Sequence, residues 1–594
     1  MMYAFYQKHE KLLIAVFVLL IQLSVVPFLN GRYLDTDNYT HAVRLLDLIQ
    51  SKTWAETPYM HSNFPFGEVL HFTRITDVLW LLCAAPLMPF MPLKSAVFWG
   101  GMVFQTVVSV GVALALVRAL KPVVPAFFGL LGVVFFFLLP TSAETFIIAK
   151  PDHHALTALF AVLTIGGMIR ALAGEANAAR QAGLFAALGL WTSIEGVAIA
   201  YAVLFPVVLL WIFNRESLRP AVDFTMSFFA CSLLFLAINP PYEGFFAPDN
   251  GRLSFLFAVV IGLSAVSFAL CARIQSTDWK VRFGAVVGAG SLSAAFVLAS
   301  FGADTVLEPW FPPFIRLIWA NSIVELQSGV SSPIYFMLTL LPSVLSLLCA
   351  AAAFKHATSF ERKVLLLTGV PLLIFAGLTA QALRYSRPAA VFSVFPVALA
   401  GYVWLEKTGK LMQVKQGVRT AVLYGAGILF LAVNYISVSR VLNSCLTASP
   451  VLLTPALSAK GALLIESNFA PEAVWMTGRP VVGTPYHRNV EGIADAFYMF
   501  HDQNEANVLY LLKKHRISDI ALYVAKAGRP DIIDFDWRKR RLFGLYSGFK
   551  NEFAARLVRG TDLPCGITPV HPIPLPWLVY HVDFSGCGLA GSSS

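Results

Sequence analysis

Long runs of hydrophobic residues fill the first 440 positions of the chain. A helix that crosses the bilayer core needs about 20 apolar residues, and thirteen windows meet that need when short or paired helices are allowed. They lie at 12–30, 95–119, 123–140, 153–173, 181–194, 195–213, 220–239, 254–272, 281–301, 333–353, 362–382, 388–406 and 420–440. The apolar segment 76–92 is broken by three prolines, which predicts a helix at the membrane surface. The pattern predicts a polytopic α-helical membrane protein.

The pattern changes after residue 444. Of the 78 charged residues, 28 lie in the last 150 positions. Segments 461–466, 479–484 and 518–524 are typical of buried strands, and 491–515 has helical periodicity. We therefore predict a membrane domain at 1–444, followed by a mixed α/β domain outside the membrane at 445–594.

Composition limits the class of protein. The 594 residues are 57% hydrophobic and only 13% charged, against about 25% charged in ordinary soluble chains. A soluble multidomain enzyme, a disordered protein and a secreted disulfide scaffold are excluded. The net charge of +10 is not clustered on one helix, so we expect no nucleic-acid partner.

Lysine and arginine favour one side of the predicted loops. With the N-terminus in the cytoplasm, the inner loops carry eighteen of them and the outer loops after the first carry six. An odd number of spans then places the C-terminal domain outside. We expect an integral protein of a bacterial inner membrane with a periplasmic C-terminal domain.

The seven cysteines show no CxxC or zinc spacing. Cys83, Cys231, Cys271 and Cys349 lie in apolar stretches and are most simply core residues. Cys565 and Cys587 lie in the C-terminal domain and could form a disulfide if that side is oxidising; the sequence leaves this open.

Ionisable residues are costly inside a membrane, so their positions are informative. None lies near the middle of a predicted span, which argues against an ion-coupled transporter. The notable ones gather at the predicted outer ends of the spans. These are Asp35, Asp37, Glu144, Asp152, His153, His154, Glu325, Arg384 and Arg387.

These residue types indicate a particular chemistry. Carboxylates with a neutral histidine suit Mn²⁺ or Mg²⁺, and arginine suits a phosphate or pyrophosphate. Together at one surface they fit metal-assisted transfer from a lipid-phosphate donor. Simpler roles remain open for single residues: Asp152 could be only a helix N-cap, Glu325 a surface residue, and Glu195 the mark of a turn.

Four short motifs extend this picture. In chain order they are Asp37-Asn38-Tyr39-Thr40-His41, Asp152-His153-His154, Ser322-Ile323-Val324-Glu325 and Arg384-Tyr385. The ordered set resembles the catalytic subunit of oligosaccharyltransferase, especially the single-subunit archaeal and bacterial enzymes of GT-C architecture. The second half of the first outer loop is also similar, at Asn63–Gly67, His71-Phe72 and Asp77.

The resemblance implies roles for these residues. Asp37, Asp152 and His154 would ligate the metal, with Asp35 as a possible substitute for Asp37. Glu325 would complete the site or hold the acceptor from a mobile loop. Arg384, or alternatively Arg387, would bind the phosphate of a polyprenyl (pyro)phosphate-linked sugar donor, and the acceptor would be a protein or a glycan.

One departure concerns the acceptor. The family's Trp-Trp-Asp motif reads the hydroxyl of Asn-x-Ser/Thr, but this chain has no adjacent tryptophans, and only Trp475 lies in the corresponding region. His71 and the set Tyr486-His487-Arg488 are candidates for an acceptor region. A lipid or polysaccharide acceptor is one alternative, and a lipid-linked sugar flippase or transporter is another.

Overall fold

The computed structural model describes residues 2–25, 31–307, 312–320, 323–404, 457, 460–523, 552–570 and 577–587. Contacts divide the chain into two compact units. Unit 1 comprises residues 1–32, 72–308 and 325–439, and unit 2 comprises 33–71, 309–324 and 440–594. The predicted domain boundary at 444 and the predicted span 420–440 lie outside the described residues.

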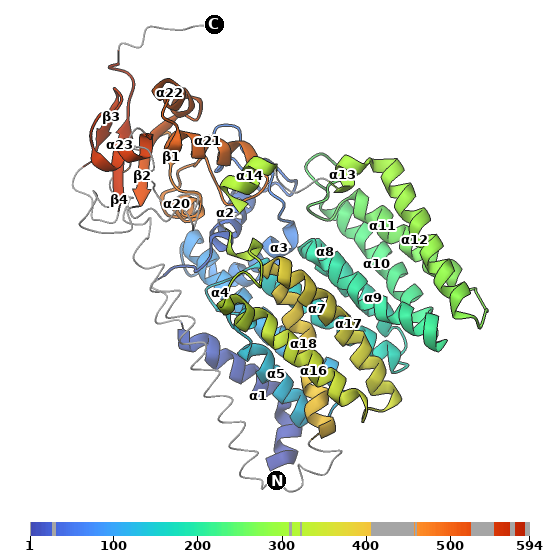
Figure 1. The fold of residues 1–594 in the computed structure, drawn as a ribbon. Helices are drawn as coiled ribbons and strands as arrows, with labels where there is room; N and C mark the ends of the chain where they lie inside the picture. The colour runs from blue at the N-terminus through green and yellow to red at the C-terminus, as the bar shows by residue number, and fades with distance from the viewer. Residues whose placement is uncertain are drawn as a thin grey trace. The chain divides into compact units, whose positions relative to one another are not determined.

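Unit 1 is a bundle of helices that lie side by side (Figure 1). Its long helices are α1 (Met2–Val25), α4 (Leu93–Leu120), α5 (Ala126–Leu138), α7 (His153–Leu172), α8 (Ala178–Thr192), α9 (Glu195–Asn214), α10 (Arg219–Ile238), α11 (Phe255–Cys271), α12 (Trp279–Phe301), α16 (Leu341–Phe354), α17 (Ser359–Gln381) and α18 (Ser386–Tyr402). The short α15 (Pro333–Tyr335) and a π-helical turn, η5 (Phe336–Leu340), lead into α16. These helices coincide with twelve of the thirteen predicted spans.

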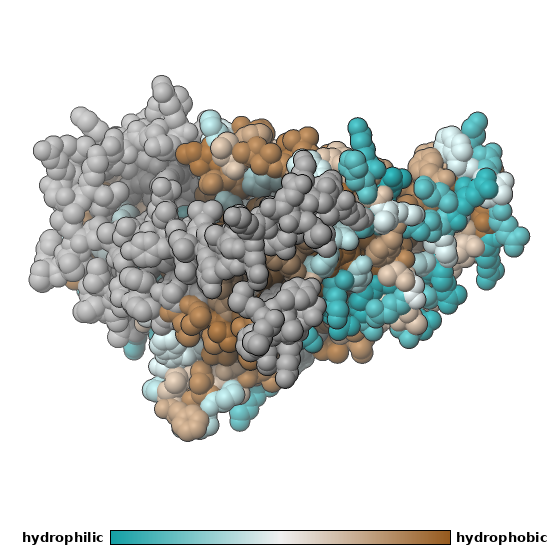
Figure 2. Space-filling model, turned by 90° about the horizontal axis from the view of Figure 1, so that it is seen from below, coloured by the Kyte–Doolittle hydropathy of each residue, from teal (hydrophilic) through white to brown (hydrophobic). Residues whose placement is uncertain are grey.

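The surface of the bundle is suited to lipid. Among the described residues, seven helical segments are long and apolar enough to cross a membrane. In α12 only 6% of the apolar window is buried within the protein, and Leu292 is 75% exposed. Hydrophobic side chains form wide patches on the flanks of the bundle in Figure 2. The predicted membrane fold is confirmed, although the count of thirteen spans is not.

Close packing of small residues sets the turn between α8 and α9. A Cβ added at Gly196 would lie 2.3 Å from the carbonyl carbon of Gly189, so only glycine allows the two helix ends to approach this closely. The turn places Glu195, the first residue of α9, in a buried position. The hairpin therefore presents a buried carboxylate at the end of the bundle.

The proline-broken segment 76–92 is not one helix. The structure has α3 (Arg74–Ala84), followed by the short 3₁₀ helix η2 (Ala85–Leu87). Leu82 is 65% exposed and Phe90 is 83% exposed, as expected for a segment that contacts the membrane surface.

Unit 2 contains a four-stranded mixed sheet in the order β1-β2-β4-β3. Its strands are β1 (Ala462–Leu464), β2 (Ile517–Tyr523), β3 (Ile567–Pro569) and β4 (Trp577–Val582). β1 pairs with β2 in parallel, and the other two pairs are antiparallel. Helices α20 (Ala470–Thr477), α21 (Val490–His501), α22 (Glu505–Lys514) and α23 (Phe553–Arg559) belong to the same unit.

One prediction for the C-terminal domain is wrong. The segment 479–484 is not a strand of the sheet: it makes only an isolated bridge between Val481 and Leu463, because Pro480 cannot donate to a ladder. The helical periodicity predicted over 491–515 is confirmed, and the structure divides the segment into two helices, because Asn504 accepts a hydrogen bond from the Ala506 amide and starts a second helix there.

The segment 481–484 instead pairs with the first loop inside unit 2. The amides of Asn63 and Phe64 donate to the carbonyls of Val482 and Val481, and the Val481 amide donates to the His61 carbonyl at 2.9 Å. A buried network continues the contact. The Thr484 hydroxyl donates to Glu68 at 2.8 Å, and the loop is therefore part of the fold of unit 2.

The cysteine pair left open by the sequence is bonded. Cys565 and Cys587 form a disulfide, whereas Cys83, Cys231, Cys271 and Cys349 are free thiols. This agrees with an oxidising compartment on the side of the C-terminal domain.

Candidate active site

The motif Asp152-His153-His154 forms the start of α7. Asp152 has the extended backbone of an N-cap, and its carboxylate accepts a hydrogen bond from the His154 amide at 3.3 Å. The helix dipole further favours a negative charge at this end. Asp152 therefore does cap the helix, as considered from the sequence. The cap uses Oδ1, and Oδ2 remains for other contacts.

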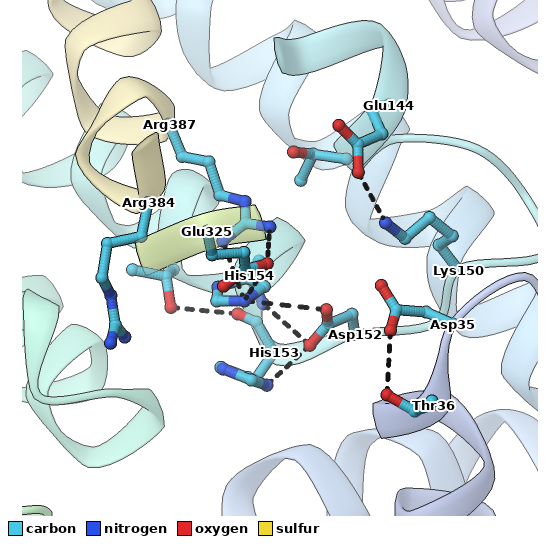
Figure 3. A network of polar contacts seen from close by, with 12 residues as sticks. Asp35, Thr36, Glu144, Lys150, Asp152, His153, His154, Glu325, Arg384 and Arg387 are labelled. Atoms are coloured by element: carbon cyan, nitrogen blue, oxygen red, sulfur yellow. Dashed lines mark hydrogen bonds and ion pairs between the residues drawn. The ribbon is translucent and has the colours of Figure 1, made fainter. Parts of the chain in front are cut away.

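The remaining contacts of Asp152 are to imidazoles. Its Oδ1 lies 2.6 Å from Nδ1 of His153, and its Oδ2 lies 3.9 Å from Nε2 of His154. All three side chains are buried. One donor atom from each lies within 4.8 Å of the others, so a carboxylate and two imidazoles converge on a small volume (Figure 3).

Arg387 extends this cluster from the first turn of α18. Its Nη1 lies 3.0 Å from Nε2 of His154, and its Nη2 forms an ion pair with Glu325. Glu325 lies in the short 3₁₀ helix η4 (Val324–Leu326), and its Oε1 is 3.9 Å from Nε2 of His154. Figure 3 shows Arg387 pointing at this pair. Ser322 of the same motif lies outside the described residues.

Arg384 is held by a different carboxylate. It lies in the 3₁₀ helix η6 (Leu383–Tyr385), and its Nε and Nη2 lie 2.8 and 2.7 Å from Oε1 of Glu195. The second oxygen of Glu195 is 3.9 Å from Nδ1 of His154. Glu195 therefore connects Arg384 to the imidazole, which is more than the turn marker considered from the sequence.

Neighbouring cations lower the pKa values of two carboxyls that lie outside the spans, Glu325 and Glu144. Burial by itself raises the pKa of Glu325, but the Arg387 guanidinium outweighs burial and holds this pKa well below its usual range. Lys150, whose Nζ is 3.1 Å from Glu144, lowers the pKa of the Glu144 carboxyl. Both carboxyls are therefore ionised at neutral pH.

Asp35 and Asp37 lie in unit 2, at the start of α2 (Thr36–Ser51). Asp35 occupies the N-cap position and accepts a hydrogen bond from the Thr36 hydroxyl at 3.3 Å. Asp37 is in the first turn, where the helix dipole favours a carboxylate. Their roles remain predictions from the motif.

The acceptor-region candidates are also in unit 2 and lie near one another. The ring of His71 is 4.7 Å from that of His487 and 6.3 Å from that of Tyr486. Tyr486 is buried and donates a hydrogen bond to the Thr40 hydroxyl at 2.6 Å. Burial, and next the charge of Asp37, raise the pKa of Tyr486 well above its usual value.

Trp475 does not replace the missing motif. It is buried in α20, with its ring 6.4 Å from that of Tyr33. The residues beside it, Val474 and Met476, offer no hydrogen-bonding side chain. The structure thus assigns Trp475 to the packing of unit 2.

Sequence reasoning missed the ion pair of Glu195. The residue lies at the predicted outer end of a span, like the other members of the cluster. A carboxylate is costly to bury at the end of an apolar span, and this cost was the one sign in the sequence that Glu195 needs a partner. Its partner is 189 positions away, so the pairing itself could not be predicted from one sequence.

The donor set fits a divalent cation. Asp152, His153 and His154 offer one carboxylate and two imidazoles within 4.8 Å. Arg387 donates a hydrogen bond to Nε2 of His154, so the neutral ring carries its proton on Nδ1. Nε2 therefore holds the lone pair, and it is the nitrogen of this ring that could ligate a cation.

Comparison with known proteins gives the fold. No family model and no curated protein sequence matches the chain significantly. Among solved structures, oligosaccharyltransferase AglB from Archaeoglobus fulgidus, in complex with an inhibitory peptide and a dolichol-phosphate, matches with a TM-score of 0.67 and 13% identity. The match covers 87% of this chain and 70% of that chain. The chain has the fold of an archaeal oligosaccharyltransferase.

Two further structures of the A. fulgidus oligosaccharyltransferase agree. One is tethered to an acceptor peptide that contains an NVT sequon, with a TM-score of 0.65, 12% identity and coverage of 97% of this chain and 76% of that one. The other contains Zn and sulfate, with a TM-score of 0.63, 13% identity and coverage of 86% and 67%. These matches confirm the predicted GT-C architecture.

Proposed function

We propose that the protein is a membrane glycosyltransferase that takes a sugar or glycan from a polyprenyl (pyro)phosphate carrier at the outer face of the membrane. The observation that carries the proposal is the cluster at the start of α7, where Asp152, His153 and His154 converge beside two arginines. The oligosaccharyltransferase fold supports it, since the AglB match was solved with a dolichol-phosphate.

The metal would be Mn²⁺ or Mg²⁺. Asp152 and His154 are its proposed ligands in unit 1, together with Glu325, and Asp37 is the ligand that the first-loop motif adds. Asp35 is the alternative to Asp37. When bound, the ion would stabilise negative charge on the departing phosphate. The structure of the A. fulgidus oligosaccharyltransferase in complex with Zn and sulfate supports this proposal.

The arginines act on the donor phosphate. A guanidinium has five N–H donors in a planar fork, so Arg384 can contact Glu195 and a phosphate at the same time. Glu195 fixes the orientation of that fork before the donor arrives, which reduces the entropy lost on binding.

The acceptor site would lie in unit 2, where His71, Tyr486, His487 and Arg488 are grouped. Discrimination for the hydroxyl of Asn-x-Ser/Thr requires buried polar groups that the wrong peptide leaves unpaired. Val474 and Met476, which flank Trp475, do not supply such groups. We therefore propose weak or no sequon preference, so that a lipid or polysaccharide acceptor remains a second candidate.

The test separates metal binding from helix capping. Purified protein is assayed for release of sugar from a polyprenyl pyrophosphate-linked donor, with and without EDTA. Asp152→Asn keeps a good N-cap residue but removes the carboxylate charge, and we expect transfer to be lost. Asp278→Asn is the matched control, because Asp278 caps α12 through the Lys280 amide and lies outside the cluster of Asp152, His153 and His154.

Three results would contradict the proposal. They are full activity of Asp152→Asn, activity unaffected by EDTA, and the finding that Asp278→Asn is as inactive as Asp152→Asn. The last result would mean that loss of charge at a helix N-cap, rather than loss of a metal ligand, explains the effect of Asp152→Asn.

A further inference from the structure

The guanidinium of Arg387 lies against two of the proposed metal ligands, His154 and Glu325. It lies 3.0 Å from Nε2 of His154 and pairs with Glu325. These two ligand atoms are themselves 3.9 Å apart. The Arg387 guanidinium therefore contacts both of the atoms, Nε2 of His154 and Oε1 of Glu325, that would ligate a divalent ion.

The competition is electrostatic. An arginine remains protonated at any pH that the protein meets, so Arg387 cannot leave these ligands by losing its charge. A divalent cation on the same two atoms would lie within a few ångströms of the guanidinium, where repulsion is strong in a buried site. His154 is buried and Arg387 is 15% exposed.

A phosphate can resolve the competition, because it offers the arginine another anionic partner. Arg387 begins α18 directly after η6, which carries Arg384. Arg387 contacts His154 and Glu325, whereas Arg384 forms its ion pair with Glu195. In Figure 3 the two heads point in different directions.

We propose that Arg387 is an exchangeable cation that holds His154 and Glu325 until a donor phosphate takes it, so that donor binding completes the metal site. The inference rests on the proposed function, and it assigns to Arg387 a role distinct from that of Arg384. Metal and lipid phosphate then bind with positive cooperativity. Because coupling is reciprocal, each ligand raises the affinity of the other by the same factor.

The experiment measures Mn²⁺ binding by electron paramagnetic resonance on the purified full-length protein, with and without a short-chain polyprenyl monophosphate. For the wild type we expect the lipid phosphate to tighten Mn²⁺ binding about tenfold, within the usual range of coupling. Arg387→Gln should bind Mn²⁺ about tenfold more tightly than the wild type without lipid, and should lose the response to lipid.

The control is Arg384→Gln, which removes an equal charge three residues away. Its lipid-free Mn²⁺ affinity should change much less than that of Arg387→Gln, because the ion pair of Arg384 is with Glu195 rather than with the proposed ligands His154 and Glu325. Equal tightening in both variants would indicate a general charge effect and overturn the proposal.

Other outcomes separate this inference from the proposed function. If the wild type binds Mn²⁺ but neither lipid nor Arg387→Gln changes the affinity, the exchange is refuted and the metal site stands. If none of the proteins binds Mn²⁺, both the exchange and the metal part of the function are refuted. Should Arg387→Gln fail to fold, the response of the wild type to lipid still decides the question.

Discussion

Removal of Arg384 should weaken binding of the lipid-linked donor while leaving the acceptor affinity unchanged. The guanidinium is only 18% exposed and is fixed by two contacts of 2.7 and 2.8 Å to Glu195. Hydrogen bonds to charged groups contribute about 1.5–3 kcal/mol. Since about 1.4 kcal/mol is a factor of ten, Arg384→Ala should raise the donor KM by about 10- to 150-fold.

The same substitution has a second effect, on stability. It leaves the buried carboxylate of Glu195 without its partner, and breaking a buried pair in this way costs about 3–5 kcal/mol. The double variant Arg384→Ala/Glu195→Gln removes that charge. We therefore expect the double variant to recover most of the lost thermal stability while keeping the raised donor KM.

The assay varies the donor at a fixed acceptor concentration, then the acceptor at a fixed donor concentration, and is accompanied by a thermal unfolding curve. Arg362→Ala is the control, because Arg362 lies at the start of α17, on the side predicted to be cytoplasmic, where it donates to the Phe354 carbonyl. The reasoning is refuted if Arg384→Ala leaves the donor KM within about twofold of the wild type, or if the double variant restores both stability and KM.

Three further predictions follow from other parts of the molecule. Asp37→Ala should abolish transfer while Asp35→Ala retains it, measured by sugar release at matched expression; the reverse result would move the ligand to Asp35. Asn-x-Thr and Asn-x-Ala peptides should be used within about tenfold of each other, whereas a preference of about 100-fold would restore a sequon reader. Burial raises the pKa of Glu68 to about 7, so the folded state binds the proton more tightly and unfolding stability should fall by up to about 3 kcal/mol as pH rises from about 4.5 to 7. Glu68→Gln should remove that part of the pH dependence of the melting temperature, and identical pH profiles would contradict the assignment.

The sequence was sufficient for features that depend on local pattern. Apolar length predicted the helices, and the spacing of Asp152, His153 and His154 before an apolar run placed them together at one helix start. That cluster needs no long-range information, because the three residues are adjacent and share one turn.

Features that depend on distant partners were not predictable. Glu195 looked like a turn residue because its partner Arg384 is far along the chain. The segment 479–484 has the composition of a strand, but it makes a single bridge to β1, and its other hydrogen bonds include those to residues 61–64. Strand β4 was missed, although it pairs with β2 along five residues, because its short run follows a proline-rich stretch.

The pairing between the first loop and residues 481–484 has a consequence for how the protein is assembled. Ser62 and Thr484 are hydrogen-bonded although 422 positions separate them. Synthesis proceeds from the N-terminus, so residues 33–71 are made and delivered long before their partners exist. Such distant pairings also form slowly. Every membrane helix must therefore be inserted first, and a chain that stops before residue 461 would leave this loop unfolded and open to proteolysis.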